Sequence, residues 1–164
     1  MSARVAPEIF RDAMQRTASG VTVVTTDGPS GRAGVTVSSL CSLSLAPPSV
    51  LVCVHRDSPA LNVLAGNGVF AANVLTAGQS RVADVFAGLV AEMREDRFAA
   101  GAWRQLVTGA PVLAGALCSF DCRVAATFDF GSHRILAGEV LAVATEAGEP
   151  LIYSGRAYRS LHAA

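Results

Sequence analysis

No stretch of this sequence is long and apolar enough to form a transmembrane helix, because polar side chains interrupt every window of about 18 residues. The first eight residues, MSARVAPE, also lack the apolar core of a signal peptide. We therefore expect a cytoplasmic protein that has no membrane partner.

The sequence has no net charge either. Its thirteen basic and thirteen acidic residues cancel, so no overall electrostatic field attracts nucleic acid. Charged residues make up 16% of the chain and hydrophobic residues 51%, which leaves too few charges to cover the surface of a monomer. We expect a homodimer and no nucleic-acid partner.

Metal-binding spacing is missing as well. The cysteines lie in apolar, strand-like runs without a neighbouring Cys or His pair to complete a zinc site, and the histidines share no ligand spacing. These residues are Cys41, Cys53, Cys118, Cys122, His55, His133 and His162. We expect reduced core thiols and no metal.

Common nucleotide-binding and hydrolase motifs are absent too. The chain has no Gly-x-Gly-x-x-Gly opening a helix, no phosphate loop ending in Lys-Ser or Lys-Thr, and no Gly-x-Ser-x-Gly nucleophile elbow. Rossmann-type nicotinamide binding is therefore unsupported. A redox role would require a bound cofactor that the protein positions.

Strand-like runs dominate what is there, and turns too short for parallel crossovers join most of them. Continuous apolar character over 49–55 predicts a central strand that is buried on both faces. The expected strands are 21–26, 34–46, 49–55, 69–75, 117–127, 134–145 and 151–154, and the expected helices begin at Pro7, Pro59 and Gln79. Residues 88–109 are irregular. Their mixture of charged residues with Phe98 and Trp103 is typical of a partly mobile loop or a short helix that lies over a pocket. We predict a single domain over 1–164, a mainly β protein whose antiparallel sheet closes into a barrel with short peripheral helices.

The run from Gly34 to Pro48 is rich in small hydroxyl side chains and carries no charge. Small alternating side chains let a ligand approach the backbone closely, and free polar groups can bond the edge of a heterocycle. The run therefore predicts a surface for a flat ligand. A Ser-rich core strand is the alternative.

Arg56 and Ser58 stand where a strand ends and a helix begins. A guanidinium, a hydroxyl and open helix N–H groups there can converge on one phosphate. The alternative is a solvated Arg beside an ordinary helix cap. Asn73 lies in an apolar strand, and its buried amide must bond either neighbouring backbone groups or a ligand edge.

His133 follows Gly131-Ser132 between two long strands, so it lies at a hairpin end where a second ligand can reach it. A simply exposed histidine is the alternative. Tyr153 and Tyr158 either wall an aromatic site or pack against the open end of the barrel.

Taken together, several motifs follow one another in a recognisable order and spacing. They are Phe10-Arg11, Gly20-Val21-Thr22-Val23-Val24-Thr25-Thr26, Thr36-x-Ser38-Ser39-x-x-Ser42-Leu43-Ser44 before Pro47-Pro48, Phe70-x-x-Asn73-Val74-Leu75, Phe86-Ala87-Gly88, Gly109-x-Pro111-Val112-Leu113 and Gly131-x-His133 before Gly138-x-Val140. The chain thereby resembles the short-chain flavin reductases of two-component flavin-dependent monooxygenases, which have an FMN-binding split-barrel fold. The likeness covers nearly all of it.

The resemblance implies an NAD(P)H:flavin oxidoreductase that reduces FMN or FAD by hydride transfer from nicotinamide to flavin N5. It also implies that reduced flavin passes to a separate monooxygenase. It leaves open FMN or FAD, and NADH or NADPH. Two rival functions remain: a split-barrel oxidase acting on a small substrate, and a non-enzymatic flavin-binding protein.

Residue by residue, the resemblance places His133 at the nicotinamide as the catalytic residue. The implied flavin contacts are Thr36, Val37, Ser38, Ser39, Ser42, Cys53, Arg56, Ser58, Asn73, Arg81, Phe86 and Tyr158. Two positions depart from the family pattern: Ser38 stands where Asn is frequent, and Ser132 where an acidic residue commonly precedes the histidine. The first bears on ring hydrogen bonding and the second on the preferred pyridine nucleotide.

Overall fold

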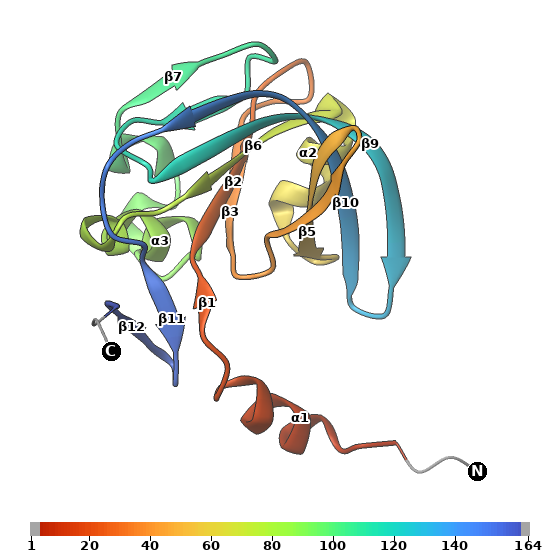
Figure 1. Ribbon diagram of the computed structural model, residues 1–164, viewed down its shortest axis with the longest axis vertical. Helices are drawn as coiled ribbons and strands as arrows, with labels where there is room; N and C mark the ends of the chain where they lie inside the picture. Colours follow the sequence, from red (N-terminus) through yellow and green to blue (C-terminus); the bar gives the residue numbers. More distant parts are fainter. Residues whose placement is uncertain (1–3, 162–164) are drawn as a thin grey trace.

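Seven antiparallel strands form the main sheet, in a computed structural model that describes residues 4–161. Their order across the sheet is β3-β2-β6-β9-β10-β5-β4. The strands are β2 (Thr22–Thr26), β3 (Ala33–Val37), β4 (Cys41–Leu45), β5 (Pro48–His55), β6 (Val69–Val74), β9 (Cys118–Phe130) and β10 (His133–Thr145). The predicted mainly antiparallel architecture is confirmed, and Figure 1 shows how strongly the sheet curves.

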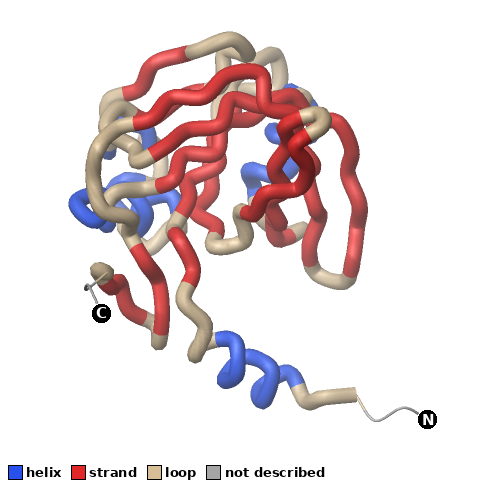
Figure 2. The backbone as a smooth tube through the Cα atoms, viewed as in Figure 1, coloured by secondary structure: helices blue, strands red, loops and turns tan. Residues whose placement is uncertain are grey.

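Smaller elements surround this sheet (Figure 2). A three-stranded sheet has the order β1-β11-β12, and β7 pairs with β8. These strands are β1 (Ser19–Gly20), β7 (Trp103–Gln105), β8 (Pro111–Leu113), β11 (Ile152–Ser154) and β12 (Ala157–Arg159). The helices are α1 (Pro7–Met14), α2 (Pro59–Asn67) and α3 (Ser80–Phe86), with 3-10 turns η1 (Ala77–Gln79), η2 (Ala91–Met93) and η3 (Arg97–Ala100).

The two outermost strands of the main sheet, β3 and β4, are consecutive in the chain and are joined by residues 38–40. Because the sheet curls, β3 also lies against β5. The barrel therefore has a seam between β3 and β5, which we call the split. The predicted split barrel is confirmed.

Two apolar clusters hold the barrel together, one on each side of β2 and β6. Val24, Phe70 and Ala72 face the cluster that includes Leu61 and Leu64 of α2. The opposite cluster joins β2 to α3, and its buried members include Val21, Val23, Leu75, Val85 and Phe86. Strands β2 and β6 are thus the ones covered on both faces.

Strand β5 differs from its prediction. Val50, Val52 and Val54 are buried, whereas the alternate residues Leu51 and Cys53 are only half-buried. The strand lies next to the edge strand β4 and not at the sheet centre. The expectation of burial on both faces is wrong, because a continuous apolar run does not reveal which strands lie on either side of it.

The hydroxyl-rich run also differs from a single strand. It divides into β3 and β4, and residues 38–40 between them belong to neither. Cys41 is exposed at the start of β4, so it is not the core thiol that was expected. All four cysteines are free thiols, and Cys122 is the buried one.

The helix α1 forms as predicted but buries none of its residues. Its apolar side chains Ile9 and Phe10 are 64% and 63% exposed, and Figure 1 shows the helix lying away from the barrel. No helix within residues 4–161 is long and apolar enough to cross a membrane.

Candidate functional site

The split is bridged by a side chain and not by a complete strand pair. The Ser39 hydroxyl accepts a hydrogen bond from the Cys53 amide at 2.9 Å and donates one to the Cys53 carbonyl at 3.1 Å. Ser38, next to it, is exposed, and its hydroxyl has no hydrogen-bond partner within residues 4–161. The residue that follows β3 therefore presents a hydroxyl group without a hydrogen-bond partner next to the seam of the barrel.

A hollow of about 180 Å³ opens beside Ser38, and we call it the ring hollow. Its lining includes Thr36, Val37, Ser38, Leu89, Tyr153 and Tyr158. The two tyrosine rings meet edge to face, with centroids 5.8 Å apart. Four of the predicted flavin contacts, Thr36, Val37, Ser38 and Tyr158, are thus brought together in one place.

Two hydrogen bonds hold the walls of the ring hollow to α3. Thr36 Oγ1 donates to the Ala83 carbonyl at 2.7 Å, and the Tyr158 hydroxyl donates to Asp84 Oδ1 at 2.6 Å. Burial, together with this bond to the Asp84 carboxylate, raises the pKa of Tyr158 well above its ordinary value. Tyr158 is therefore a neutral, fixed wall at neutral pH.

The tip of the β9–β10 hairpin carries His133, as predicted, and sets it opposite His55 of β5. The two imidazole rings lie 5.0 Å apart at 77°. Ser132 Oγ lies 2.9 Å from His133 Nδ1, and Arg56 Nη1 lies 3.5 Å from the Gly131 carbonyl. The predicted phosphate residue Arg56 and the predicted nicotinamide residue His133 are thus neighbours.

A bidentate ion pair stiffens the same hairpin. Arg134 Nε and Nη2 donate to the two carboxylate oxygens of Asp129 at 2.6 and 2.8 Å. This hydrogen bonding lowers the pKa of Asp129 and raises that of Arg134. The strand positions on either side of the turn are therefore held in register next to His133.

Ser58 occupies the position that precedes α2, as predicted, but its hydroxyl makes no capping bond there. Pro59 follows at the first helical position, where a missing N–H costs nothing. The hydroxyl of Ser58 therefore remains available to an anion, whereas the Leu61 amide already donates to the Ser58 carbonyl at 3.0 Å.

Asn73 has a different role from the expected flavin contact. Its side chain is fully buried, and its Oδ1 accepts hydrogen bonds from Leu113 N and Ser119 Oγ, both at 2.9 Å. Its Nδ2 donates to the Val23 carbonyl at 3.0 Å and to Thr25 Oγ1 at 3.1 Å. No amide group is left for a ligand, so the structure favours the alternative in which protein groups satisfy Asn73.

Phe86 is also a core residue and not a flavin contact. It is 1% exposed, and Phe98 and Trp103 pack on its ring edge to face at 5.1 and 5.5 Å. A Cβ added to Gly34 would lie 2.6 Å from this ring, so β3 rests directly on Phe86. Segment 88–109, which supplies Phe98 and Trp103, is accordingly packed against α3.

Arg81 lies exposed on α3, outside the lining of the ring hollow.

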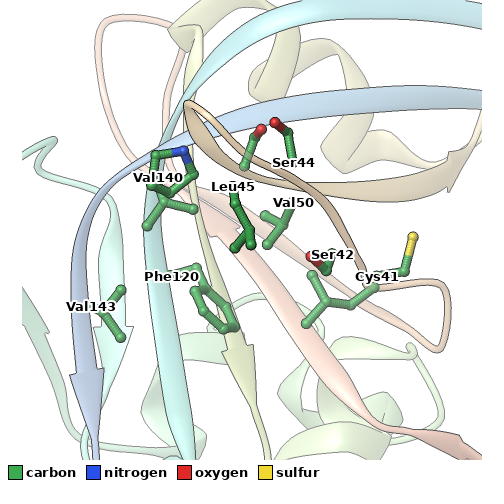
Figure 3. Close-up of a pocket in the computed structure, with 11 residues that line it drawn as sticks. Cys41, Ser42, Ser44, Leu45, Val50, Phe120, Val140 and Val143 are labelled. Atoms are coloured by element: carbon green, nitrogen blue, oxygen red, sulfur yellow. The ribbon is translucent and has the colours of Figure 1, made fainter.

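Ser42 lies elsewhere, in an apolar groove of about 370 Å³ beside the edge strand β4. Figure 3 shows Leu45, Val50, Phe120 and Val140 around this groove, with the Cys41 sulfur turned away. The structure therefore does not bring Ser42 to Ser38 and Tyr158.

Metal or thiolate chemistry finds no support at these positions. Within residues 4–161, no three His, Cys, Asp or Glu side chains are grouped to hold a metal ion, and His162 lies outside the described residues. Burial raises the pKa of Cys118, and burial with the nearby Asp121 raises the pKa of Cys122 to about 12. Both are therefore protonated thiols at neutral pH.

Sequence reasoning missed His55 as a neighbour of His133 and Leu89 as a wall of the ring hollow. It also gave no site role to Arg156 or to Arg11 of the Phe10-Arg11 motif, and both line a second hollow adjoining the first. A local pattern does not reveal these contacts, because each contact joins segments that are distant in the sequence.

The ring hollow suits a planar heterocycle such as a flavin ring. Val21, Val37 and Leu89 give it apolar walls, and the free Ser38 hydroxyl stands at its rim. Apolar walls with a few placed polar groups are typical of cofactor sites.

Comparison with known proteins agrees with this geometry. The model of the family "Flavin reductase like domain" matches residues 14–162. FMN reductase (NADH) RutF from Ancylobacter novellus is 44% identical over 96% of this chain and 86% of its own length. The NADH:FAD oxidoreductase SgcE6 of Streptomyces globisporus, solved with NAD and FAD fragments, superposes with a TM-score of 0.87 at 33% identity and covers 98% of both chains. BorF, the flavin reductase component of a bacterial two-component tryptophan halogenase, has a TM-score of 0.83 at 32% identity and covers 95% of this chain and 98% of its own. With its family model spanning most of the sequence, this chain belongs to the flavin reductase family, as the resemblance predicted.

Proposed function

We propose that this protein is an NADH-dependent flavin reductase that passes reduced flavin to a separate monooxygenase. The observation that carries the proposal is the ring hollow at the end of β3, where apolar walls adjoin the free Ser38 hydroxyl. The family and the NADH-dependent relatives agree with it. When bound, the flavin would supply the redox chemistry, which is hydride transfer from the nicotinamide to flavin N5 with a proton taken up from solvent.

The protein's own groups hold the two rings in contact. Val37 and Tyr158, which line the ring hollow, would border the flavin ring, and Ser38 would donate a hydrogen bond to its polar edge. Thr36 and Ser39 already bond protein carbonyls, so they fix β3 and the split and do not act as free donors. Close stacking of two preorganised rings supplies most of what hydride transfer requires.

Arg56 and Ser58 bind the flavin phosphate. The guanidinium offers a positive charge, and the start of α2 offers the free Ser58 hydroxyl and the positive end of the helix dipole to the same anion. Arg81 on α3 is a further contact that we carry over from the family.

His133 orients the carboxamide of the nicotinamide at the exposed hairpin tip. Its Nδ1 is held by Ser132 Oγ, which leaves Nε2 for the ligand. Because hydride transfer demands no strong acid or base, the role of His133 is to position the ring.

A second copy of the chain covers the apolar groove beside β4. Leu45 is 89% exposed at this edge, and Leu43 and Val143 are 49% and 53% exposed. An exposed apolar edge strand invites pairing with an identical strand, and two-fold dimers form by such self-complementary contacts. The low charged share of the sequence agrees with a homodimer.

The deciding experiment follows absorbance at 340 nm while purified protein meets NADH or NADPH, with and without FMN or FAD, in air. We expect flavin-dependent loss of the nicotinamide signal, faster with NADH. A protein that binds flavin but consumes neither nucleotide would be an oxidase or a carrier. Oxygen consumption driven by a small substrate without NADH separates the oxidase from the carrier. Addition of a flavin-dependent monooxygenase with its substrate tests whether the reduced flavin is passed on.

A further inference from the structure

A second hollow, of about 360 Å³, continues from the ring hollow and shares Ser38 and Tyr153 with it. Two arginines, Arg11 and Arg156, line it together with hydroxyl side chains such as Thr17 and Ser19. No carboxylate is among its lining residues. We call it the arginine hollow, and its chemistry is that of an anion site.

The segments that carry the two arginines are fastened to each other. The Gly155 amide donates to the Gln15 carbonyl at 2.8 Å, which ties the β11–β12 turn to the end of α1. Beyond this bond, Ser19 of β1 pairs with Tyr153 of β11. The backbone segments that carry the two arginines are therefore held together by hydrogen bonds, although both arginine side chains are exposed.

Neither arginine has a carboxylate partner among residues 4–161. Another hollow is also rich in arginine, since Arg32, Arg94 and Arg97 line it, but Glu95 and Asp96 line it too, and Asp27 pairs with Arg32 at 3.6 Å. Charge is thus compensated there, and it is left uncompensated in the arginine hollow. An unpaired pair of guanidinium groups is suited to phosphate oxygens.

Arg156 has an unfavourable backbone conformation for its residue type. Its φ of 62° follows a φ of 60° at Gly155, in the two-residue turn between Ser154 and Ala157. Such turns favour Gly or Asn at both positions, because a larger side chain with positive φ is strained. Retained strain at a residue that lines a hollow points to a function of its side chain.

We propose that Arg11 and Arg156 bind the pyrophosphate of the pyridine nucleotide whose nicotinamide ring lies against the flavin. This inference rests on the proposed function, which gives the flavin phosphate to Arg56 and Ser58. The pyridine dinucleotide brings two further phosphates. The shared lining residues Ser38 and Tyr153 make the arginine hollow the direct continuation of the ring hollow.

The first test measures binding alone and needs no turnover. Calorimetry measures the binding of inorganic pyrophosphate, NAD⁺ and FMN to the full chain and to the double variant Arg11→Ala/Arg156→Gly. We expect the Kd of pyrophosphate and of NAD⁺ to rise at least about 10-fold, since charged hydrogen bonds are lost. The Kd of FMN stays unchanged. Glycine tolerates positive φ, so the melting temperature of Arg156→Gly is no lower than that of the wild type.

The matched control is Arg16→Ala/Arg159→Ala, which removes the same charge from exposed positions that do not line the hollow. We expect it to bind all three ligands like the wild type. Equal losses in both double variants would mean a general charge effect and would overturn the site. Unchanged pyrophosphate binding, or a loss for FMN in place of NAD⁺, would overturn it as well.

A kinetic arm tests the same assignment. For the Arg11→Ala/Arg156→Gly variant we expect the KM for NADH to rise about 10-fold. The rate with N-benzyl-1,4-dihydronicotinamide, which has the ring but no phosphate, stays unchanged. If the wild type consumes no NADH, the proposed function fails, while the binding measurements still decide the pyrophosphate site.

Discussion

Ser39 and Cys53 form the one side-chain bridge that we find across the split within residues 4–161. The Ser39 hydroxyl is 2.9 Å from the Cys53 amide and 3.1 Å from its carbonyl. Backbone pairing between β4 and β5 starts only at Cys41 and Leu51. The Ser39 hydroxyl therefore takes the place of two backbone hydrogen bonds in the segment that joins β3 to β4.

Replacing Ser39 with Ala leaves both backbone groups of Cys53 without this partner. We expect the free energy of unfolding to fall by about 1–3 kcal/mol, the usual cost of unsatisfied polar groups. Urea denaturation measures it. The control is Ser49→Ala, whose hydroxyl bonds the Pro47 carbonyl in an exposed turn and whose loss costs about 0.5 kcal/mol or less. A Ser39→Ala protein as stable as the control would contradict this role.

Asn73 is predicted to matter for stability and not for flavin affinity. Replacing it with Ala orphans the buried Leu113 amide and the Ser119 hydroxyl, so we expect the free energy of unfolding to fall by about 2–4 kcal/mol. FMN affinity, measured by fluorescence quenching at a temperature where the variant is folded, stays within about 2-fold of the wild type. A selective loss of flavin binding with unchanged stability would restore Asn73 to the flavin site. The control Ser119→Ala removes one donor of the same network and should show a smaller loss.

Local patterns in the sequence predicted the antiparallel barrel, its hairpins and its helices. Short turns such as 27–31 and 131–132 and the runs of β-branched residues are local signals, and the structure keeps them. Burial was harder to predict. The apolar run of β5 is typical of a strand buried on both faces, yet β2 and β6 are the strands buried in that way, because the apolar clusters that include α2 and α3 cover their two faces.

Only part of the candidate site was predicted, because sequence patterns report local structure and not contacts between distant segments. Thr36, Val37, Ser38 and Tyr158 meet at the ring hollow, as the family resemblance implied. The partners of Asn73 lie 40 and 46 positions away, at Leu113 and Ser119, and no local pattern reveals them. The neighbourhood of His55 and His133 likewise depends on the register between β5 and β10.

Tyr158 is predicted to make the folded protein less stable at alkaline pH. Burial and the bond to Asp84 raise the pKa of Tyr158 in the folded protein above the value of about 10 in an unfolded chain. Its contribution is therefore complete below pH about 10 and is lost as the pH rises through the folded pKa, because the unfolded state releases the proton first. We expect the stability of the wild type to fall more steeply than that of Tyr158→Phe above pH about 10, as measured by urea denaturation. Parallel profiles for the two proteins would contradict the prediction.

Leu45 is predicted to anchor the dimer. A charge on this exposed edge residue would be buried in the interface, so we expect Leu45→Asp and Val143→Asp each to raise the dimer Kd at least about 100-fold. Sedimentation velocity at several protein concentrations measures the shift to monomer. Val107→Asp, at a residue that is 66% exposed outside the groove, is the control and remains dimeric. A wild type that is monomeric at micromolar concentration would rule out the proposed interface.

A substitution of His133 is predicted to affect the use of NADH and not the binding of FMN. Because its ring stands at the hairpin tip and carries only the Ser132 contact and the edge of His55, its replacement by Ala should leave the fold and the flavin affinity intact. We expect kcat/KM for NADH to fall about 10- to 100-fold through lost positioning of the nicotinamide, with the Kd of FMN unchanged. Stopped-flow reduction of the flavin at varied NADH concentration measures this, and His133→Gln, which keeps a hydrogen-bonding group, should recover part of the loss. Ser132→Ala is the matched control: it frees the ring of His133 without removing it and should have a smaller effect. Steady-state kinetics of His133→Ala that match the wild type would remove this histidine from the site.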